Sequence, residues 1–172
     1  RAADMQLSYA AGFLLVPGAL DGNPVRQLLD TGSQASSVTP AAAERLKLDR
    51  SIRRTLVHGI GGDVVTADVE LASFAVGPLR MVERTLAVAP VEQIPGVPPV
   101  SGIVGADFLT DFDLDLDPRH RLLTLFRTRH CGTAFAPWQN AGAPLALLAP
   151  GRHLVAIDVQ IDAQTVGALV DT

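Results

Sequence analysis

Asp30 occupies a position where a charged side chain needs an explanation. It follows the apolar pair Leu28-Leu29, and Thr31-Gly32 and several small hydroxyl residues follow it. An ionised carboxylate beside a buried strand is costly unless the surroundings hold it. Asp30 therefore either caps a turn at a strand end or acts as an acid or base, and the triplet alone does not decide between these roles.

A second Asp-Thr pair, Asp171-Thr172, ends a stretch that aligns with the first at a constant offset of 141 residues. The aligned positions are apolar in both copies, or acidic in both: Leu14 with Val155, Val16 with Ile157, Leu20 with Ile161, Asp21 with Asp162, Val25 with Val166, Leu28 with Leu169 and Leu29 with Val170. This match runs without gaps over about eighteen residues, so residues 153–172 are predicted to open a second copy of the same unit.

Twenty residues are too few for a self-sufficient domain. We therefore expect the natural chain to continue for about another domain length past Thr172, with a natural end at Thr172 as the alternative. The chain begins at Arg1 rather than Met. A removed upstream signal peptide or anchor would favour a periplasmic or secreted protein over a cytoplasmic one.

The elements that must position these residues are predicted to be mostly strands, because short apolar segments alternate with Gly and Pro. The expected elements are a strand at 13–16, a hairpin at 19–30 that turns at Asp21-Gly22, strands at 53–57 and 63–71, two strands within 71–90 that turn at Gly77-Pro78, a proline-rich loop at 91–102 and a hairpin at 112–126. One helix is predicted from Thr39 to Leu48, with Thr39 as its cap and Pro40 at its first position.

The composition of the sequence changes after the predicted hairpin at 112–126. Residues 127–152 are rich in Gly, Pro and Ala without periodicity, which predicts a linker. The predicted organisation is an N-terminal lobe at 1–126, a linker at 127–152, and the first hairpin of a second lobe at 153–172.

Four segments together resemble the aspartic proteases of the pepsin and retropepsin type, and most nearly bacterial retropepsin-like proteins that carry two lobes in one chain. The segments are LLDTGSQASSVT at 28–39, the flap-like HGIGG at 58–62, GIVGADFL at 102–109 and FDLDLDPRHRLLTL at 112–125. The resemblance covers residues 13–126 as one lobe. It implies an all-β, acid-protease (retropepsin-like) barrel lobe with one short helix.

The resemblance also implies roles for the motif residues. Asp30 and Asp171 would form the catalytic pair, one from each lobe, because two close carboxylates share one proton and can divide the acid and base roles, for which aspartic proteases are a well-known example. The supporting loop would comprise Thr31, Gly32, Ser33 and Thr172, and the segment that threads beneath it would comprise Ile103, Val104 and Gly105. The flap would comprise His58, Gly59, Ile60, Gly61 and Gly62, without the Tyr of pepsin-type flaps.

The implied activity is hydrolysis of a peptide or protein substrate, with no cofactor and no metal. The partner of the first lobe would be either the second lobe of the same chain or a second copy. Two alternatives stay open at this stage: a non-catalytic module that binds peptides or a partner protein in the same cleft, and a homodimer that uses Asp30 from two chains.

Other chemistries are disfavoured by the sequence. The net charge is −4 and no Lys/Arg run interleaves with aromatic residues, which argues against nucleic acid. The acidic run from Asp113 has Pro118 and Thr124 where a calcium loop needs Gly and an acid. The lone Cys131 supports neither a disulfide nor a cysteine metal site. Neither a serine-hydrolase elbow nor a phosphate-binding loop is present.

Overall fold

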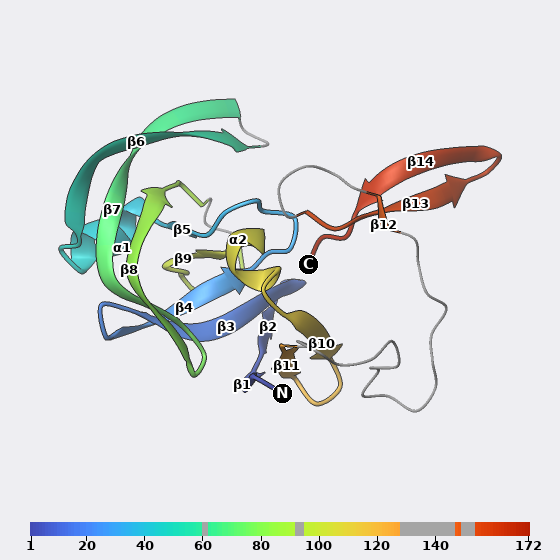
Figure 1. The fold of residues 1–172 in the computed structure, drawn as a ribbon, viewed down its shortest axis with the longest axis horizontal. Coiled ribbons are helices and arrows are strands. Elements are labelled where there is room, and N and C mark those ends of the chain that lie inside the picture. Colours follow the sequence, from blue (N-terminus) through green and yellow to red (C-terminus); the bar gives the residue numbers. More distant parts are fainter. Residues whose placement is uncertain (60–61, 92–94, 128–146, 149–153) are drawn as a thin grey trace.

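The computed structural model of the 172-residue chain describes residues 1–59, 62–91, 95–127, 147–148 and 154–172. Within these residues the fold is all-β with two short helices, arranged around three sheets (Figure 1). The predicted fold class is confirmed. In the described part of the chain, no helix has both the length and the apolar character needed to cross a membrane.

The largest sheet has eight strands in the order β2-β3-β4-β9-β5-β8-β7-β6, and a further pairing of β3 with β7 curls it. Its strands are β2 (Ser8–Ala10), β3 (Phe13–Leu20), β4 (Asn23–Leu29), β5 (Ser37–Val38), β6 (Asp49–Gly59), β7 (Gly62–Val76), β8 (Leu79–Val88) and β9 (Gly102–Val104). Nearly all of these strands pair antiparallel. The exceptions are β4 with β9 and β5 with β8, which pair parallel. The parallel pair at the centre places β9 directly beside β4, which ends one residue before Asp30.

Two smaller sheets complete the described chain. One has the order β1-β11-β10, with β1 at Ala3–Gln6, β10 at Asp113–Asp117 and β11 at Leu122–Phe126. The other has the order β12-β13-β14, with β12 at Leu147–Leu148, β13 at Ala156–Ile161 and β14 at Gln164–Leu169. Figure 1 shows the β13–β14 hairpin and the long β6–β7 hairpin projecting on opposite sides of α2 (Ala106–Leu109).

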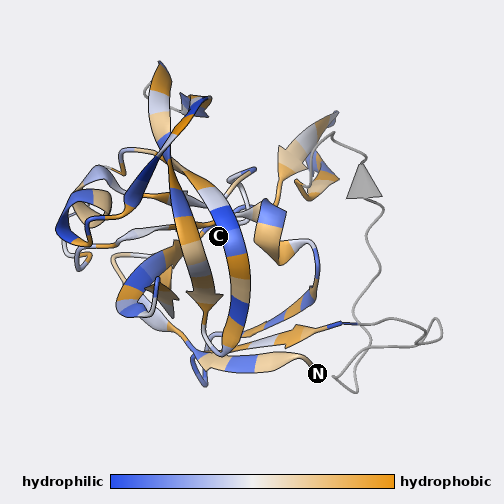
Figure 2. Ribbon diagram, turned by 60° about the vertical axis from the view of Figure 1, so that its left-hand side comes forward, coloured by the Kyte–Doolittle hydropathy of each residue, from blue (hydrophilic) through white to orange (hydrophobic). Residues whose placement is uncertain are grey.

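The core is almost wholly aliphatic, as expected from a sequence with 5% aromatic residues. Apolar and polar residues follow one another along the strands (Figure 2), and most strands bury part of their apolar side chains, whereas β6 and β14 contain no buried residue. The largest side chains that are fully buried are Phe74, Leu15, Leu20, Leu29, Leu123, Leu125, Gln27, Val16, Val38, Val69, Val76 and Val104. Leu29 and Val104 are the last residues of the neighbouring strands β4 and β9, so Asp30 and the start of α2 both follow rigid elements.

The predicted hairpins are present where local turn chemistry specified them. Asp21 and Gly22 both have positive φ, at 47° and 78°, which is the two-residue turn that matches the twist of a β-hairpin. The turn at 77–78 separates β7 from β8, and residues 118–121 separate β10 from β11. Several strands are longer than predicted, and β1 and β2 were not predicted. The partner of β1 is the distant β11, which local sequence does not reveal, whereas β2 is a three-residue strand that pairs with the neighbouring β3.

Helix α1 (Pro40–Arg45) begins as predicted but ends earlier than Leu48. The Thr39 hydroxyl accepts a hydrogen bond from the Ala42 N–H, and Pro40 takes the first position. The helix stops because Leu46 closes it and Lys47 adopts a left-handed φ of 52°. The prediction of one helix also missed α2, since four residues are too few to show a helical period.

The β13–β14 hairpin has the same register as the β3–β4 hairpin. Leu15 pairs with Leu28 in the first, and Ala156 with Leu169 in the second; both residues are displaced by 141. The same displacement relates all six pairs, and it also relates Asp21 to Asp162, whose φ of 53° is also positive. The predicted linker at 127–152 lies mostly outside the described residues.

Candidate active site

Asp30 follows directly on β4, whose last residue, Leu29, is completely buried. The Asp30 N–H donates to the Val104 carbonyl at 3.1 Å, which continues the parallel pairing of Leu29 with Val104. Ile103 and Val104, which were predicted as part of the supporting segment, thus pair with the strand that leads to Asp30. The backbone of Asp30 is anchored to the centre of the sheet.

The Asp30 carboxylate is held by the backbone of its own loop. The Ser33 N–H donates to Asp30 Oδ1 at 2.8 Å. Burial raises the pKa of Asp30 most strongly, and the hydrogen bond from the Ser33 N–H lowers it. The charge of Asp171 raises this pKa further. The Gly32 N–H lowers the pKa and the side-chain contact with Asp171 raises it, both by smaller amounts. The pKa of Asp30 therefore lies above its ordinary value, because desolvation and a second carboxylate outweigh the backbone donors.

The carboxylate of Asp171 packs against Gly32. A Cβ added at Gly32 would lie 2.6 Å from Asp171 Cγ and 2.6 Å from Asp171 Oδ1. Any side chain at position 32 would displace Asp171 from this place. The glycine of the Asp-Thr-Gly triplet thus makes room for the second carboxylate, a contact that the sequence did not reveal.

Thr31 and Thr172 join the two Asp-Thr pairs reciprocally. Thr31 Oγ1 donates to the Val170 carbonyl at 2.8 Å, and Thr172 Oγ1 donates to the Leu29 carbonyl at 3.1 Å. The Thr31 N–H also donates to Thr172 Oγ1 at 3.2 Å. Each acceptor carbonyl belongs to the residue before the corresponding aspartate. The structure therefore brings Asp30, Asp171 and the two threonines together within one chain.

Ser33 contacts Asp30 through its backbone and not through its hydroxyl. The hydroxyl donates to the Ala35 carbonyl at 3.0 Å, and the backbone N–H is the group that contacts Asp30. The Ser33 carbonyl accepts the Ala106 N–H at 2.8 Å. Gly105 lies close below, since a Cβ there would be 2.6 Å from the Ala35 carbonyl carbon.

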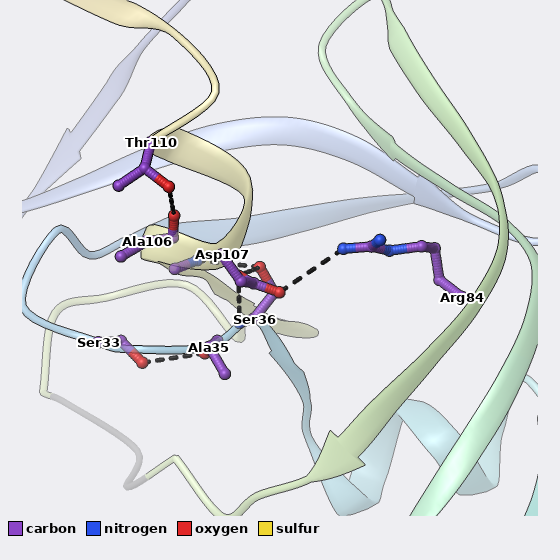
Figure 3. A network of polar contacts seen from close by, with 8 residues as sticks. Ser33, Ala35, Ser36, Arg84, Ala106, Asp107 and Thr110 are labelled. Carbon is purple, nitrogen blue, oxygen red and sulfur yellow. Dashed lines mark hydrogen bonds and ion pairs between the residues drawn. The ribbon is translucent and has the colours of Figure 1, made fainter. Parts of the chain in front are cut away.

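Ser36 and Asp107 form a polar network beside this loop that sequence reasoning missed (Figure 3). Asp107 lies within the GIVGADFL segment, but its partner Ser36 is 71 residues away. The only signal in the sequence was a carboxylate two residues after Gly105, on an otherwise apolar segment. A single sequence does not reveal which distant group such a carboxylate contacts.

The flap-like segment forms the end of the β6–β7 hairpin. Gly59 pairs with Gly62, while Ile60 and Gly61 lie outside the described residues. His58 Nδ1 lies 2.7 Å from Asp63 Oδ1 on the opposite strand, and both side chains are exposed. Within the part of the chain that the structure describes, the polar contacts of Asp30 and Asp171 do not include this hairpin.

The arrangement suits acid–base chemistry by a carboxyl pair. Two carboxyl groups that lie this close together do not readily ionise at the same time. The pKa of Asp30 is shifted upward, which is the direction of shift expected when two carboxyl groups share one proton. Among the described residues, no group of three or more His, Cys, Asp or Glu side chains is placed to hold a metal ion.

Comparison with known proteins identifies the family. No curated protein matches the chain. Among solved structures, a retropepsin-like aspartic protease from Rickettsia conorii shares 16% identity, with 72% of this chain and 88% of that chain covered and a TM-score of 0.49. The retroviral protease-like domain of Ddi1 from Leishmania major shares 20% identity, with 66% and 87% covered and a TM-score of 0.42.

The family model described as "Aspartyl protease" matches residues 16–108. This match spans more than half of the 172 residues and includes both Asp30 and Gly105. It confirms the family that the sequence motifs indicated. The chain belongs to the aspartyl protease family.

Proposed function

We propose that this chain forms part of an aspartic endopeptidase in which Asp30 and Asp171 together activate a water molecule against a peptide bond. The observation that carries the proposal is the reciprocal bonding of Thr31 and Thr172, which holds the two Asp-Thr pairs against each other. A structural turn at either strand end would need no such partner.

In the proposed mechanism the carboxyl pair holds one proton between its two members. One carboxylate accepts a proton from water, and the other carboxyl donates a proton to the carbonyl oxygen of the scissile bond. Burial of Asp30 favours the protonated form, because it raises the pKa of that carboxyl. The Ser33 N–H limits this effect and keeps the carboxyl oriented.

The substrate would be an extended peptide that pairs its backbone with strands near the carboxyl pair. The glycine-rich end of the β6–β7 hairpin would cover it, and Gly62, the first residue of β7, has a positive φ of 109°. Closure of such a hairpin excludes water from the reacting groups. No cofactor takes part in this proposal.

The function is tested with Asp30→Asn in the full-length protein, with Asp111→Asn as the matched control. Loss of one member of an acid–base pair is expected to reduce kcat on the order of a thousandfold, while the circular dichroism spectrum stays unchanged. The exposed Asp111 lies outside the proposed site, so its variant should retain activity. Full activity in Asp30→Asn would refute the proposal, and peptide binding without cleavage by the parent would favour a binding module instead.

The homodimer alternative has less support in the contacts. In a homodimer, the loop that follows Asp30 would have to face a second copy of itself. In this chain residues 170–172 already bond to Thr31 of that loop and to Leu29, the residue before Asp30. We therefore propose that the two carboxylates come from one chain.

A further inference from the structure

Asp107 makes two hydrogen bonds to a residue of the loop that follows Asp30. Asp107 Oδ1 accepts the Ser36 N–H at 2.7 Å and the Ser36 hydroxyl at 2.7 Å (Figure 3). The Ser36 hydroxyl in turn accepts the Gly105 N–H at 3.0 Å. Ser36 is only 2% exposed, so these bonds lie out of water, where each lost partner is costly.

The other oxygen of Asp107 faces Arg84 of β8. The Arg84 guanidinium lies 3.8 Å from Asp107 Oδ2, and the two side chains are 37% and 28% exposed (Figure 3). A half-exposed ion pair at this distance contributes little to stability. The two buried bonds through Oδ1 are therefore the stronger part of the network.

This network is continuous with the carboxylate of Asp30. Ala106 and Asp107 are neighbours in α2. The Ala106 N–H donates to the Ser33 carbonyl at 2.8 Å, and the Asp107 carboxylate accepts the Ser36 N–H. The Ser33 N–H then donates to Asp30 Oδ1 at 2.8 Å. The segment from 33 to 36 is thus fixed to the start of α2 at both ends, and one of those ends aims an N–H at Asp30.

We propose that Asp107 is a positioning residue for Asp30, acting through Oδ1 on the loop at 33–36 rather than through its charge on Arg84. The catalytic consequence rests on the proposed function, while the positioning itself is a property of the fold. Asp107 would keep the Ser33 N–H directed at the Asp30 carboxylate without touching substrate or the reacting atoms.

A simpler reading is that Asp107 only stabilises a short helix. It is the acidic residue in the first turn of α2, and Gly105, the residue before the helix, makes no side-chain capping bond. That reading requires no effect on Asp30. Variants of Asp107 would then lower the melting temperature and leave the titration of Asp30 unchanged, which makes the two readings distinguishable.

The test compares Asp107→Ala, Asp107→Asn and the control Asp111→Ala in the 172-residue chain, by carbon-detected NMR titration of the Asp30 carboxyl and amide exchange of residues 33–36. In Asp107→Ala the titration midpoint of Asp30 should rise, on the order of one pH unit if the Ser33 bond is lost, and exchange at 33–36 should accelerate. Asp107→Asn should resemble the parent, because its amide oxygen can accept both Ser36 bonds.

Each of the following outcomes would contradict a part of the proposal. An unchanged Asp30 titration in folded Asp107→Ala would overturn the positioning role, and Asp107→Asn matching Asp107→Ala would overturn the assignment to Oδ1. If Asp107→Ala does not fold, Ser36→Ala removes one of the two bonds and should shift Asp30 in the same direction by less. An unchanged titration in that variant would then overturn the proposal.

Activity of the full-length protein gives a second readout. Misplacement of a reacting group by about 1 Å costs about a hundredfold in rate, so Asp107→Ala should lower kcat by about ten- to a hundredfold with KM little changed. A full-length parent without peptidase activity, together with the expected shift of the Asp30 titration, would refute the proposed function and leave the positioning role standing.

Discussion

At the scale of single residues, Asp30 combines two opposing influences on its charge. Burial and the nearby Asp171 disfavour the carboxylate, while the Ser33 and Gly32 N–H groups favour it. The net effect is a pKa above the ordinary value of 3.8. Asp30 therefore remains partly protonated at a higher pH than an exposed aspartate does, which is useful for a group that must hold or pass a proton.

This raised pKa predicts how stability changes with pH. Between pH 3.8 and the folded pKa of Asp30, the folded chain binds more protons than the unfolded chain. The contribution of Asp30 to stability is thus fully present below pH 3.8 and is lost as the pH rises through the folded pKa. Asp30→Asn mimics the protonated form and should raise the melting temperature at pH 7 but not at pH 3, measured by calorimetry.

Asp117 serves as a control because its pKa is shifted in the opposite direction to that of Asp30. The His120 side chain beside it lowers the pKa of Asp117, whose side chain is 40% exposed. Its contribution is present above its ordinary pKa and is lost as the pH falls through the lowered value. Asp117→Asn should therefore not raise the melting temperature at pH 7. If Asp30→Asn were the less stable variant at pH 7, desolvation would not be the dominant influence on Asp30.

At the scale of elements, the passage from β9 into α2 is packed against the loop that follows Asp30. A Cβ at Gly105 would meet the Ala35 carbonyl carbon at 2.6 Å and the Ser36 nitrogen at 2.9 Å. Both are backbone atoms, which have no rotamer by which to move away. A glycine is needed here for close approach between two chain segments, and not for an unusual φ.

Gly105→Ala should therefore destabilise the chain. Overpacking of this kind costs about 1–3 kcal/mol, which lowers the melting temperature by several degrees in a chain of this size. Gly59→Ala is the matched control, because its nearest contact would be the Gly62 carbonyl at an ordinary 3.8 Å. Thermal unfolding of both variants by circular dichroism checks this, and equal melting temperatures would show that the loop at 35–36 can yield.

At the scale of the whole molecule, the β13–β14 hairpin is uncovered where its counterpart is buried. Ile161 is 61% exposed whereas Leu20 is 1% exposed, and Leu169 is 50% exposed whereas Leu28 is 7% exposed. In the described residues β14 pairs with β13 alone, whereas β4 also pairs with β9. This apolar surface would be covered in the proposed protein by a second lobe or by a second copy.

We expect this exposed surface to drive weak, concentration-dependent association of the 172-residue chain, because large apolar patches rarely stay open to water. The double variant Ile161→Thr, Leu169→Thr should sediment as a monomer in analytical ultracentrifugation. Val65→Thr with Val82→Thr, which alters two other exposed apolar residues, should not change association.

The same experiment separates the two forms of the site. If association persisted in the Ile161→Thr, Leu169→Thr variant and disappeared in Thr31→Ala, the contact between copies would run through the Asp30 loop. That result would favour the homodimer with two Asp30 residues. The domain boundaries at 126 and 152 stay predictions, since most of the intervening segment lies outside the described residues.

The sequence by itself determined the features that short-range chemistry controls. Asp21-Gly22 specified a hairpin turn, Thr39-Pro40 specified the start of α1, and the alternation at 112–126 specified a hairpin. The two Asp-Thr pairs, at a constant offset, indicated a second copy of the same unit, and the resemblance to aspartic proteases implied that the two aspartates form a carboxyl pair. Each of these signals lies within a few residues or repeats itself, so a single sequence is sufficient to show it.

Only the tertiary structure decided which distant groups meet. It placed Asp171 against Gly32, Ser36 against Asp107 and Gly105 beneath Ala35, although these partners are far apart along the chain. The physical reason is that hydrogen bonds and close packing depend on where the backbone returns in space, and residue types alone do not carry that information. A sequence shows the same glycine or aspartate whether that residue is exposed to solvent, lies in a turn or contacts the second carboxylate of a pair.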